Sequence, residues 1–191
     1  SYTRFNDLKK AEAQSRQAQI EVAVERVRAK ALAMHKSGEI MGVAVTMRKE
    51  LEALNMPGFD AATITLKQDD GTIRLWDNTS AKQHEEGTWE NTEFKFRLED
   101  NHPDFYLNKI WSSNDRYIVV EQDKHDLKIT TDWVRKHDKN LADVVVHYYK
   151  ENGIKQAWHP AVALSYGRLN LDCYVHAPEP EVENILIKMA A

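Results

Sequence analysis

The chain has 191 residues, with 26 Lys or Arg against 30 Asp or Glu and a formal net charge of −4. Charges of both signs are mixed along the sequence and form no basic stripe, so we expect no nucleic-acid partner. The hydrophobic content of 42% includes five Trp, seven Tyr and five Phe, which supports a folded domain rather than a disordered chain.

The cysteine content and the hydropathy pattern exclude some classes of protein. Cys173 is the single cysteine, so an intrachain disulfide framework is excluded. The sequence has neither a signal peptide nor an apolar run near the length that a membrane-spanning helix needs. We therefore expect a cytoplasmic module without membrane contact of its own.

The first 56 residues favour helix, since no Gly or Pro occurs before Gly38 and Ala, Glu, Gln, Lys, Arg and Leu dominate. The pattern is already helical at Ser1, from which we expect a piece of a longer protein. Five apolar residues then follow a 4-3-4-3 spacing: Ile20, Val24, Val27, Ala31 and Met34. This spacing predicts a seam that pairs with a second copy in a homodimer. The alternative is a helix packed on its own domain.

A second helix is expected after Ser37, which can cap it with Glu39 in its first turn. Pro57-Gly58 ends this helix. Its predicted buried face comprises Ile40, Val43, Ala44, Met47, Leu51 and Leu54.

From residue 59 onward, apolar residues recur at every second position on both sides of the turn Asp69-Asp70-Gly71. This pattern predicts a β-hairpin over residues 62–75. Residues 78–91 have no period and are expected to form a long surface loop. Further strands are expected at residues 94–98, 117–121, 156–165 and 168–175.

Several helices are expected among these strands. One starts at Asn101-His102-Pro103 and runs through Trp111. Others are expected over residues 130–137, over residues 141–152 with an end at Asn152-Gly153, and after Pro178 with a buried face of Val182, Ile185, Leu186 and Met189. The order of elements predicts an α+β domain with a mainly antiparallel sheet and terminal helices that lie together. We divide the chain into a linker helix at 1–36 and a globular domain at 37–191.

Motifs for catalysis or metal binding find no support. Ser165 partly matches a nucleophile elbow, but a strand rather than a helix follows it. Cys173 and His176 are three apart on a predicted strand and point to opposite faces, so we expect no metal site. The seven Gly form no phosphate-binding loop. We expect the fragment to have no enzymatic activity, against the alternative of an enzyme of small-molecule metabolism with a catalytic dyad in a pocket.

Aromatic and polar residues are the remaining candidates for a binding site: Trp76, Trp89, Phe94, Phe96, Trp111, Trp158, His159 and Tyr166. They could line a small-molecule pocket on one face of the sheet or fill an ordinary core. We take Trp76, Trp89, Trp158 and His159 as candidate ligand-binding residues. The expected site lies on the face covered by the 78–91 loop and the 103–111 helix. The sequence names no ligand and no cofactor.

Parts of both ends resemble a segment found with GAF-like sensory domains in bacterial sensor histidine kinases of the Bacteroidetes type. The resemblance rests on residues 11–14, 19–21, 25–37, 165–169 and 176–181. It implies a GAF-like fold and a dimeric, non-catalytic module that relays signals to adjacent sensor or kinase domains of the two-component system. GAF domains bind small molecules in many cases, but no ligand residue of the family can be placed here. The alternative is a structural dimerisation spacer without a ligand.

Overall fold

The computed structural model describes residues 2–34, 36–79 and 90–191. Two helices lead the chain. The helix α1 (Tyr2–Leu32) and the helix α2 (Ile40–Ala53) are joined through a short 3₁₀ turn, η1 (Ser37–Glu39). Because this turn occupies Ser37, the N-cap position of α2 falls on Glu39, and the predicted Ser37 cap is wrong.

Within the described residues, six strands form one antiparallel sheet in the order β3-β2-β1-β6-β5-β4. The strands are β1 (Phe59–Lys67), β2 (Ile73–Thr79), β3 (Asn91–Phe96), β4 (Tyr117–Gln122), β5 (Ala157–Leu164) and β6 (Gly167–Cys173). The predicted hairpin is confirmed, because β1 and β2 pair around a turn in which Gly71 adopts φ +80°. That left-handed conformation favours glycine.

Four further helices surround the sheet: α3 (Tyr106–Ser112), α4 (Lys124–His137), α5 (Lys139–Glu151) and α6 (Glu181–Ala190). A 3₁₀ turn, η3 (Leu98–Asp100), follows β3. The predicted first residues of two of these helices are wrong. The helix α3 begins three residues after Pro103, because Phe105 is extended. The helix α4 begins well before residue 130, since the Asp123 side chain accepts hydrogen bonds from two backbone N–H groups of its first turn.

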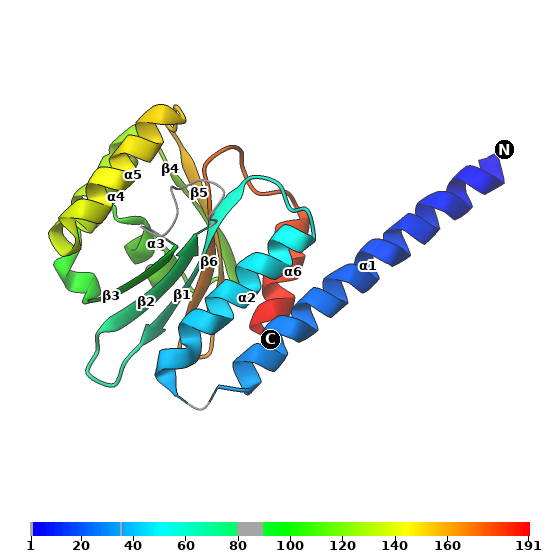
Figure 1. Cartoon of the computed structure of the whole chain (residues 1–191), viewed down its shortest axis with the longest axis horizontal. Helices are drawn as coiled ribbons and strands as arrows, with labels where there is room; N and C mark the ends of the chain where they lie inside the picture. Colours follow the sequence, from blue (N-terminus) through cyan, green and yellow to red (C-terminus); the bar gives the residue numbers. More distant parts are fainter. Residues whose placement is uncertain (1, 35, 80–89) are drawn as a thin grey trace.

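The elements form three layers, with the sheet in the middle (Figure 1). The helices α1, α2 and α6 cover one face, and α3, α4 and α5 lie on the other. The expected α+β class, the mainly antiparallel sheet, the flanking helices and the long N-terminal helix are confirmed. The terminal helices α1 and α6 lie side by side, where Arg16 and Glu181 form an ion pair.

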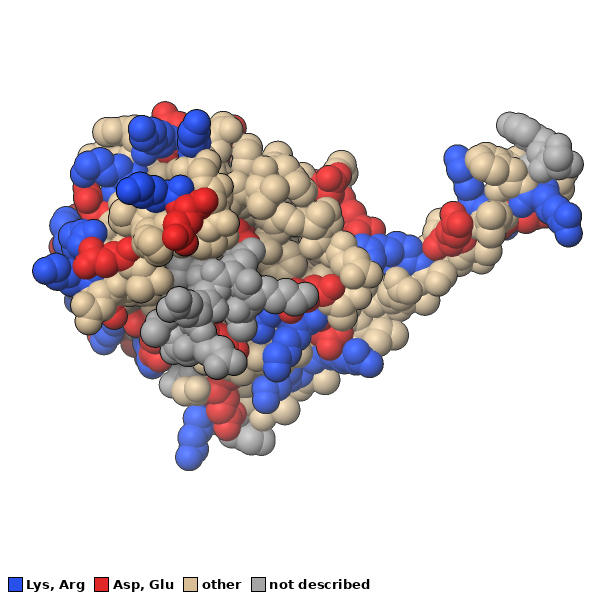
Figure 2. All heavy atoms as spheres, turned by 45° about the horizontal axis from the view of Figure 1, so that its top comes forward, with Lys and Arg blue, Asp and Glu red and all other residues tan. Residues whose placement is uncertain are grey.

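The surface carries both signs of charge. Figure 2 shows Lys and Arg interspersed with Asp and Glu over the side of the domain that it draws and along the projecting part of α1. No helix within the described residues is both long and apolar enough to cross a membrane.

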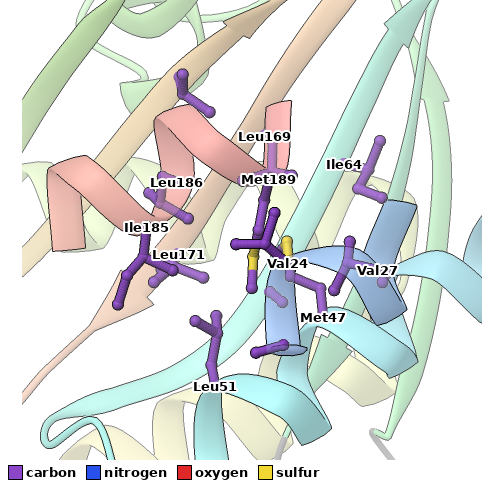
Figure 3. Close-up of a cluster of buried hydrophobic side chains, with 14 of the residues drawn as sticks. Val24, Val27, Met47, Leu51, Ile64, Leu169, Leu171, Ile185, Leu186 and Met189 are labelled. Atoms are coloured by element: carbon purple, nitrogen blue, oxygen red, sulfur yellow. The ribbon is translucent and has the colours of Figure 1, made fainter. Parts of the chain in front are cut away.

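The first core lies between the sheet and the helices α1, α2 and α6. Figure 3 shows its side chains meeting from all three helices and the strands: Val24, Val27, Met47, Leu51, Ile64, Leu169, Leu171, Ile185, Leu186 and Met189. The predicted inner faces of α2 and α6 are confirmed by this cluster. Residues on both sides of the boundary at residue 36 therefore share one core.

The seam assigned to dimerisation belongs to this first core. Ile20, Val24 and Val27 are buried, and Ala31 and Met34 pack against the same cluster. The assignment of these five residues to an intermolecular interface is therefore wrong. The 4-3-4-3 spacing does mark a helix-packing face, but the partners are α2 and α6 of the same chain.

Candidate ligand cavity

Polar side chains occupy the middle of the sheet on the face toward α3, α4 and α5. Thr63 of β1 stands between Asp77 of β2 and Asn170 of β6 in the strand register. Asp172 lies two residues beyond Asn170 and therefore on the same face. His159 of β5 reaches Asp172 across the strands. These residues form the polar floor: Thr63, Asp77, His159, Asn170 and Asp172.

Four residues of the polar floor, Thr63, Asp77, His159 and Asp172, line a cavity between the sheet and the helices. The space open to the centres of water-sized spheres is about 70 Å³. Apolar and aromatic side chains from β2, β3, the three helices and the residues next to α3 and β6 line the rest of the cavity: Leu75, Phe94, Phe105, Tyr106, Trp133, Val134, Leu141, Val145, Tyr149 and Tyr174. A mostly apolar cavity with a few converging polar groups is typical of small-molecule sites.

Trp133 is the central ring of the cavity wall. It stacks on Phe105 with ring centroids 4.8 Å apart and an interplanar angle of 22°. Phe94 meets Trp133 edge-on at 5.1 Å. The indole Nε1–H donates a hydrogen bond of 2.8 Å to Asn101 Oδ1, which fixes the ring orientation. The wall is therefore built on a well-anchored aromatic cluster.

His159 is held at both ring nitrogens. Nδ1 lies 2.6 Å from Asp172 Oδ1, and Nε2 lies 2.8 Å from Gln122 Oε1. The Gln122 amide nitrogen donates to the carbonyl oxygen of Asp126, which fixes the oxygen of the amide toward the ring. Both ring nitrogens thus face acceptors, an arrangement that the doubly protonated imidazolium satisfies. Tyr106 stacks on the ring at a centroid distance of 4.0 Å.

This geometry argues against a catalytic role for the His159–Asp172 pair. A histidine that acts as general base must offer a free nitrogen to the group whose proton it takes. Here Nε2 is occupied by Gln122, and the ring is almost fully buried. Within the described residues, no three His, Cys, Asp or Glu side chains converge as a metal site requires.

Asp77 is the second carboxylate at the floor. Its two oxygens accept hydrogen bonds from Thr63 Oγ1 at 2.6 Å and from Thr79 Oγ1 at 3.1 Å. Burial, with the nearby charge of Asp172, raises the pKa of Asp77 to about 7. The same two causes raise the pKa of the neighbouring Asp60 to about 7. A cluster of buried carboxyl groups with raised pKa values is typical of functional sites.

The sequence-predicted site residues separate onto different faces. His159 lines the cavity. Trp76 is buried in the first core, and Trp158 packs against that core, so both lie on the opposite face of the sheet. Their assignment to the site is wrong, because each is one residue away from a cavity-facing position and strand residues alternate between faces. Trp89 lies outside the described residues, as does most of the 78–91 loop.

Sequence reasoning missed most of the cavity residues. Trp133 is the one tryptophan absent from the eight aromatic and polar candidates, yet it lines the cavity and stacks on Phe105. The strand sequence Leu169-Asn170-Leu171-Asp172-Cys173 carried a usable signal, because Asn and Asp alternate with apolar residues inside a strand. Such a pattern is usually interpreted as a solvent-facing side. Here helices cover that side.

Comparison with known proteins gives a fold-level likeness. No protein-family model matches the chain, and no curated protein matches it. Among solved structures, the chain is similar to the phycoerythrobilin-bound GAF domain from a cyanobacterial phytochrome, with a TM-score of 0.43 and 13% sequence identity. The match covers 91% of this chain and 88% of that chain.

Proposed function

We propose that this chain is a GAF-like sensory module that binds a small molecule in the cavity between the sheet and α3, α4 and α5. In this proposal it is a non-catalytic, cytoplasmic part of a bacterial sensor histidine kinase, as its sequence resemblance implies. The observation that carries the binding role is the cavity with aromatic walls and a polar floor.

The composition of the floor supports binding over simple core packing. His159, Asn170 and Asp172 are buried, and Asp77 is half-buried, at a position where apolar side chains would fill a core. Buried ionic groups contribute little net stability, and replacing a whole buried ion pair by apolar residues is often neutral or stabilising. Their presence beside a cavity is therefore better explained by recognition than by stability.

The relay part of the proposal depends on the terminal helices. Arg16 and Arg28 of α1 contact α6, where Arg16 pairs with Glu181 and Arg28 donates to the carbonyl oxygen of Lys188 at 2.8 Å. The Lys188 ammonium in turn pairs with Glu21. These partly exposed pairs contribute little energy, but they set the register of the two helices. A ligand that binds two helix arrangements with different affinity would shift their populations.

Self-association is proposed through an exposed face of α1. The N-terminal half of α1 projects beyond the globular part of the molecule (Figure 1). Phe5, Leu8 and Val22 are large apolar residues of α1 that are exposed by half or more. A second copy of α1 would cover these exposed apolar residues. The proposed homodimer therefore uses this face instead of the buried seam.

The second candidate function is a structural dimerisation spacer without a ligand. It is favoured by the same exposed α1 residues, since a helical pairing face requires no cavity. The sensory module should bind a small molecule in the cavity, whereas the structural spacer should not.

A pair of neighbouring valines on α5 separates the candidates. Val145 lines the cavity and is 4% exposed, whereas Val146 is 42% exposed. We would screen the unchanged chain against a small-molecule fragment library by thermal shift and by ligand-observed NMR. Ligands should bind the unchanged chain and the Val146→Phe control, and should lose binding in Val145→Phe, which fills the cavity. Circular dichroism would check that both variants fold.

Two outcomes would count against ligand binding in the cavity. The first is a complete absence of ligands, which favours the spacer. The second is a set of ligands that bind Val145→Phe as well as the unchanged chain, because their site would then lie elsewhere.

A further inference from the structure

The charged groups that line the cavity are unequal in sign. The Asp, Glu and His residues among the lining residues that the structure describes are Asp77, Asp172 and His159, and that lining includes no Lys or Arg. With both carboxylates ionised, the lining carries more negative than positive charge in either protonation state of His159. An anionic ligand would enter against this charge, whereas a cationic ligand would neutralise it.

His159 is committed to Asp172, which leaves Asp77 as the available carboxylate. His159 Nδ1 lies 2.6 Å from Asp172 Oδ1, so Asp172 already has a partner. Among the ion pairs of the described residues, none includes Asp77. Its hydrogen bonds come from two neutral threonine hydroxyls, Thr63 and Thr79. A carboxylate has about four acceptor sites, so Asp77 retains capacity for a further donor.

A second polar side chain, Asn170, lies next to the lining residues Thr63 and Asp172 but does not itself line the cavity. Asn170 is fully buried, and its Oδ1 has no hydrogen-bond partner among the described residues. Its register partner on β1 is Thr63, a lining residue, and its Nδ2 donates to Asp172 at 3.2 Å. Buried carbonyl oxygens normally have a partner, and leaving one unpaired is costly.

Aromatic rings complete the lining of the cavity. Trp133 and Phe105 stack nearly parallel, and Phe94 and Tyr106 also belong to the lining. This aromatic part of the lining suits the hydrocarbon part of a small organic ligand.

We propose that the ligand is a small protonated organic amine, with its ammonium group at Asp77 and its apolar part against Trp133 and Phe105. The proposal rests on the proposed binding role of the cavity and adds the chemical class. The ammonium N–H groups supply the donors that the free acceptor sites of Asp77 lack, and the aromatic wall accepts the hydrocarbon.

The protonation of Asp77 gives the proposal a pH signature. Its raised pKa means that a large part of the carboxyl group is protonated near pH 7 in the unliganded chain. A bound cation favours the carboxylate, so binding releases a proton and tightens as pH rises from 6 to 8. The titratable groups that face Asp77 from the packed elements are Asp172 on β6, His159 on β5, Tyr106 on α3, Tyr149 on α5 and Tyr174 after β6.

Isosteric probes of different charge test the ligand class. Isothermal titration calorimetry would compare benzylammonium, benzyl alcohol and benzoate, and a smaller set of isobutylammonium, isobutanol and isobutyrate, at pH 6 and pH 8. We expect the ammonium of at least one set to bind roughly tenfold or more tightly than its alcohol. This preference should increase at pH 8 and disappear in Asp77→Asn, which keeps an acceptor and a donor for the two threonines. Asp132→Asn, a change at an exposed carboxylate, should leave it intact.

The other outcomes are decisive as well. Equal or tighter binding of the alcohol or the carboxylate overturns the cation proposal, and loss of that binding in Val145→Phe would leave the proposed cavity function standing. Absence of binding by all six probes also overturns the cation proposal, while the fragment library still tests the cavity function. Ammonium binding that survives both Asp77→Asn and Val145→Phe places the cation outside the cavity and overturns the cation proposal, while the fragment library still tests the cavity function.

Discussion

The Nδ1 atom of His159 lies 2.6 Å from Oδ1 of Asp172 in the interior of the sheet–helix sandwich, where both side chains are buried. Removing one partner of a buried ion pair leaves the other charge uncompensated, which costs about 3–5 kcal/mol. We therefore expect Asp172→Asn to lower the free energy of unfolding by about 3 kcal/mol in urea denaturation. The exposed pair of Lys128 and Asp132 provides the control, since Asp132→Asn should cost less than about 1 kcal/mol. Equal effects of the two substitutions would contradict this.

The stability of the chain should fall as pH rises from about 4 to about 7. The pKa of Asp77 and of Asp60 is raised to about 7 in the folded chain, against about 3.9 for an unfolded aspartate. The folded state therefore binds more protons across this window, and stability present below pH 4 is lost as pH approaches 7. Asp77→Asn should flatten the profile measured by denaturation at a series of pH values.

Asp70 provides a control of opposite sign for that measurement. Hydrogen bonds from Thr72 and Lys95 hold the pKa of Asp70 below its usual range. Its contribution is therefore present at neutral pH and is lost as pH falls below about 4. Asp70→Asn should change the acid end of the profile and leave the interval from pH 5 to 7 unchanged. If Asp77→Asn also acts only at the acid end, the buried environment of Asp77 is not what sets the profile.

Two valines of α1 test whether the helix belongs to the core. Val24 is fully buried and Val22 is 50% exposed. Removing two buried methyl groups loses their transfer free energy and leaves a cavity, so Val24→Ala should cost about 2 kcal/mol. Val22→Ala should change the unfolding free energy by less than about 0.5 kcal/mol. Similar values for both, measured by thermal unfolding, would mean that α1 does not pack on the domain in solution.

The proposed dimer face predicts a different response from substitution at Leu8. This residue of α1 is 59% exposed, so Leu8→Glu should weaken self-association in sedimentation velocity without lowering the thermal unfolding temperature. Val175→Glu changes another exposed apolar residue, outside α1, and should leave association unchanged. A Leu8→Glu variant that associates as tightly as the unchanged chain would exclude this part of α1 from the interface.

Close backbone contact makes Gly167 intolerant of a side chain. A Cβ atom there would come within 2.1 Å of the carbonyl oxygen of Thr65 on the neighbouring strand. Gly167→Ala must move β6 away from β1, and we expect a loss of about 1–3 kcal/mol in chemical denaturation. Gly38→Ala, where no atom lies within 4 Å of the added Cβ, should be nearly neutral. A neutral Gly167→Ala would show that the two strands separate easily at this point.

Local patterns allowed most elements to be predicted from sequence, because period and turn chemistry depend on neighbouring residues. The hairpin around Gly71 and the inner face of α6, with Ile185 and Leu186, are examples. The start of α4 was missed although Asp123 is a good N-cap residue, since no apolar period marks the first turn. The boundaries were therefore less predictable than the elements.

The cavity was harder to predict, because it depends on which face of a strand meets which helix. Trp158 and His159 are adjacent, yet only His159 faces the cavity. The aromatic character of a residue says nothing about the face it occupies, whereas the alternation of Asn170 and Asp172 with leucines does. The partner of the seam at Val24 was undetermined for a related reason: a helical stripe indicates that something covers it, but not whether the cover belongs to the same chain.

Neighbouring residues of β2 point to opposite faces of the sheet, so one residue borders the cavity and the next borders the helices on the other face. Asp77 faces the cavity, while its neighbours Trp76 and Asn78 are buried on the side of α2, where the Asn78 side chain accepts a hydrogen bond from Arg48. The helix α2 is linked onward to α1 by the pair of Glu50 and Arg26. The strand β2 therefore connects the cavity to the helices on the other face of the sheet, and the residue at this connection is the one proposed to touch the ligand.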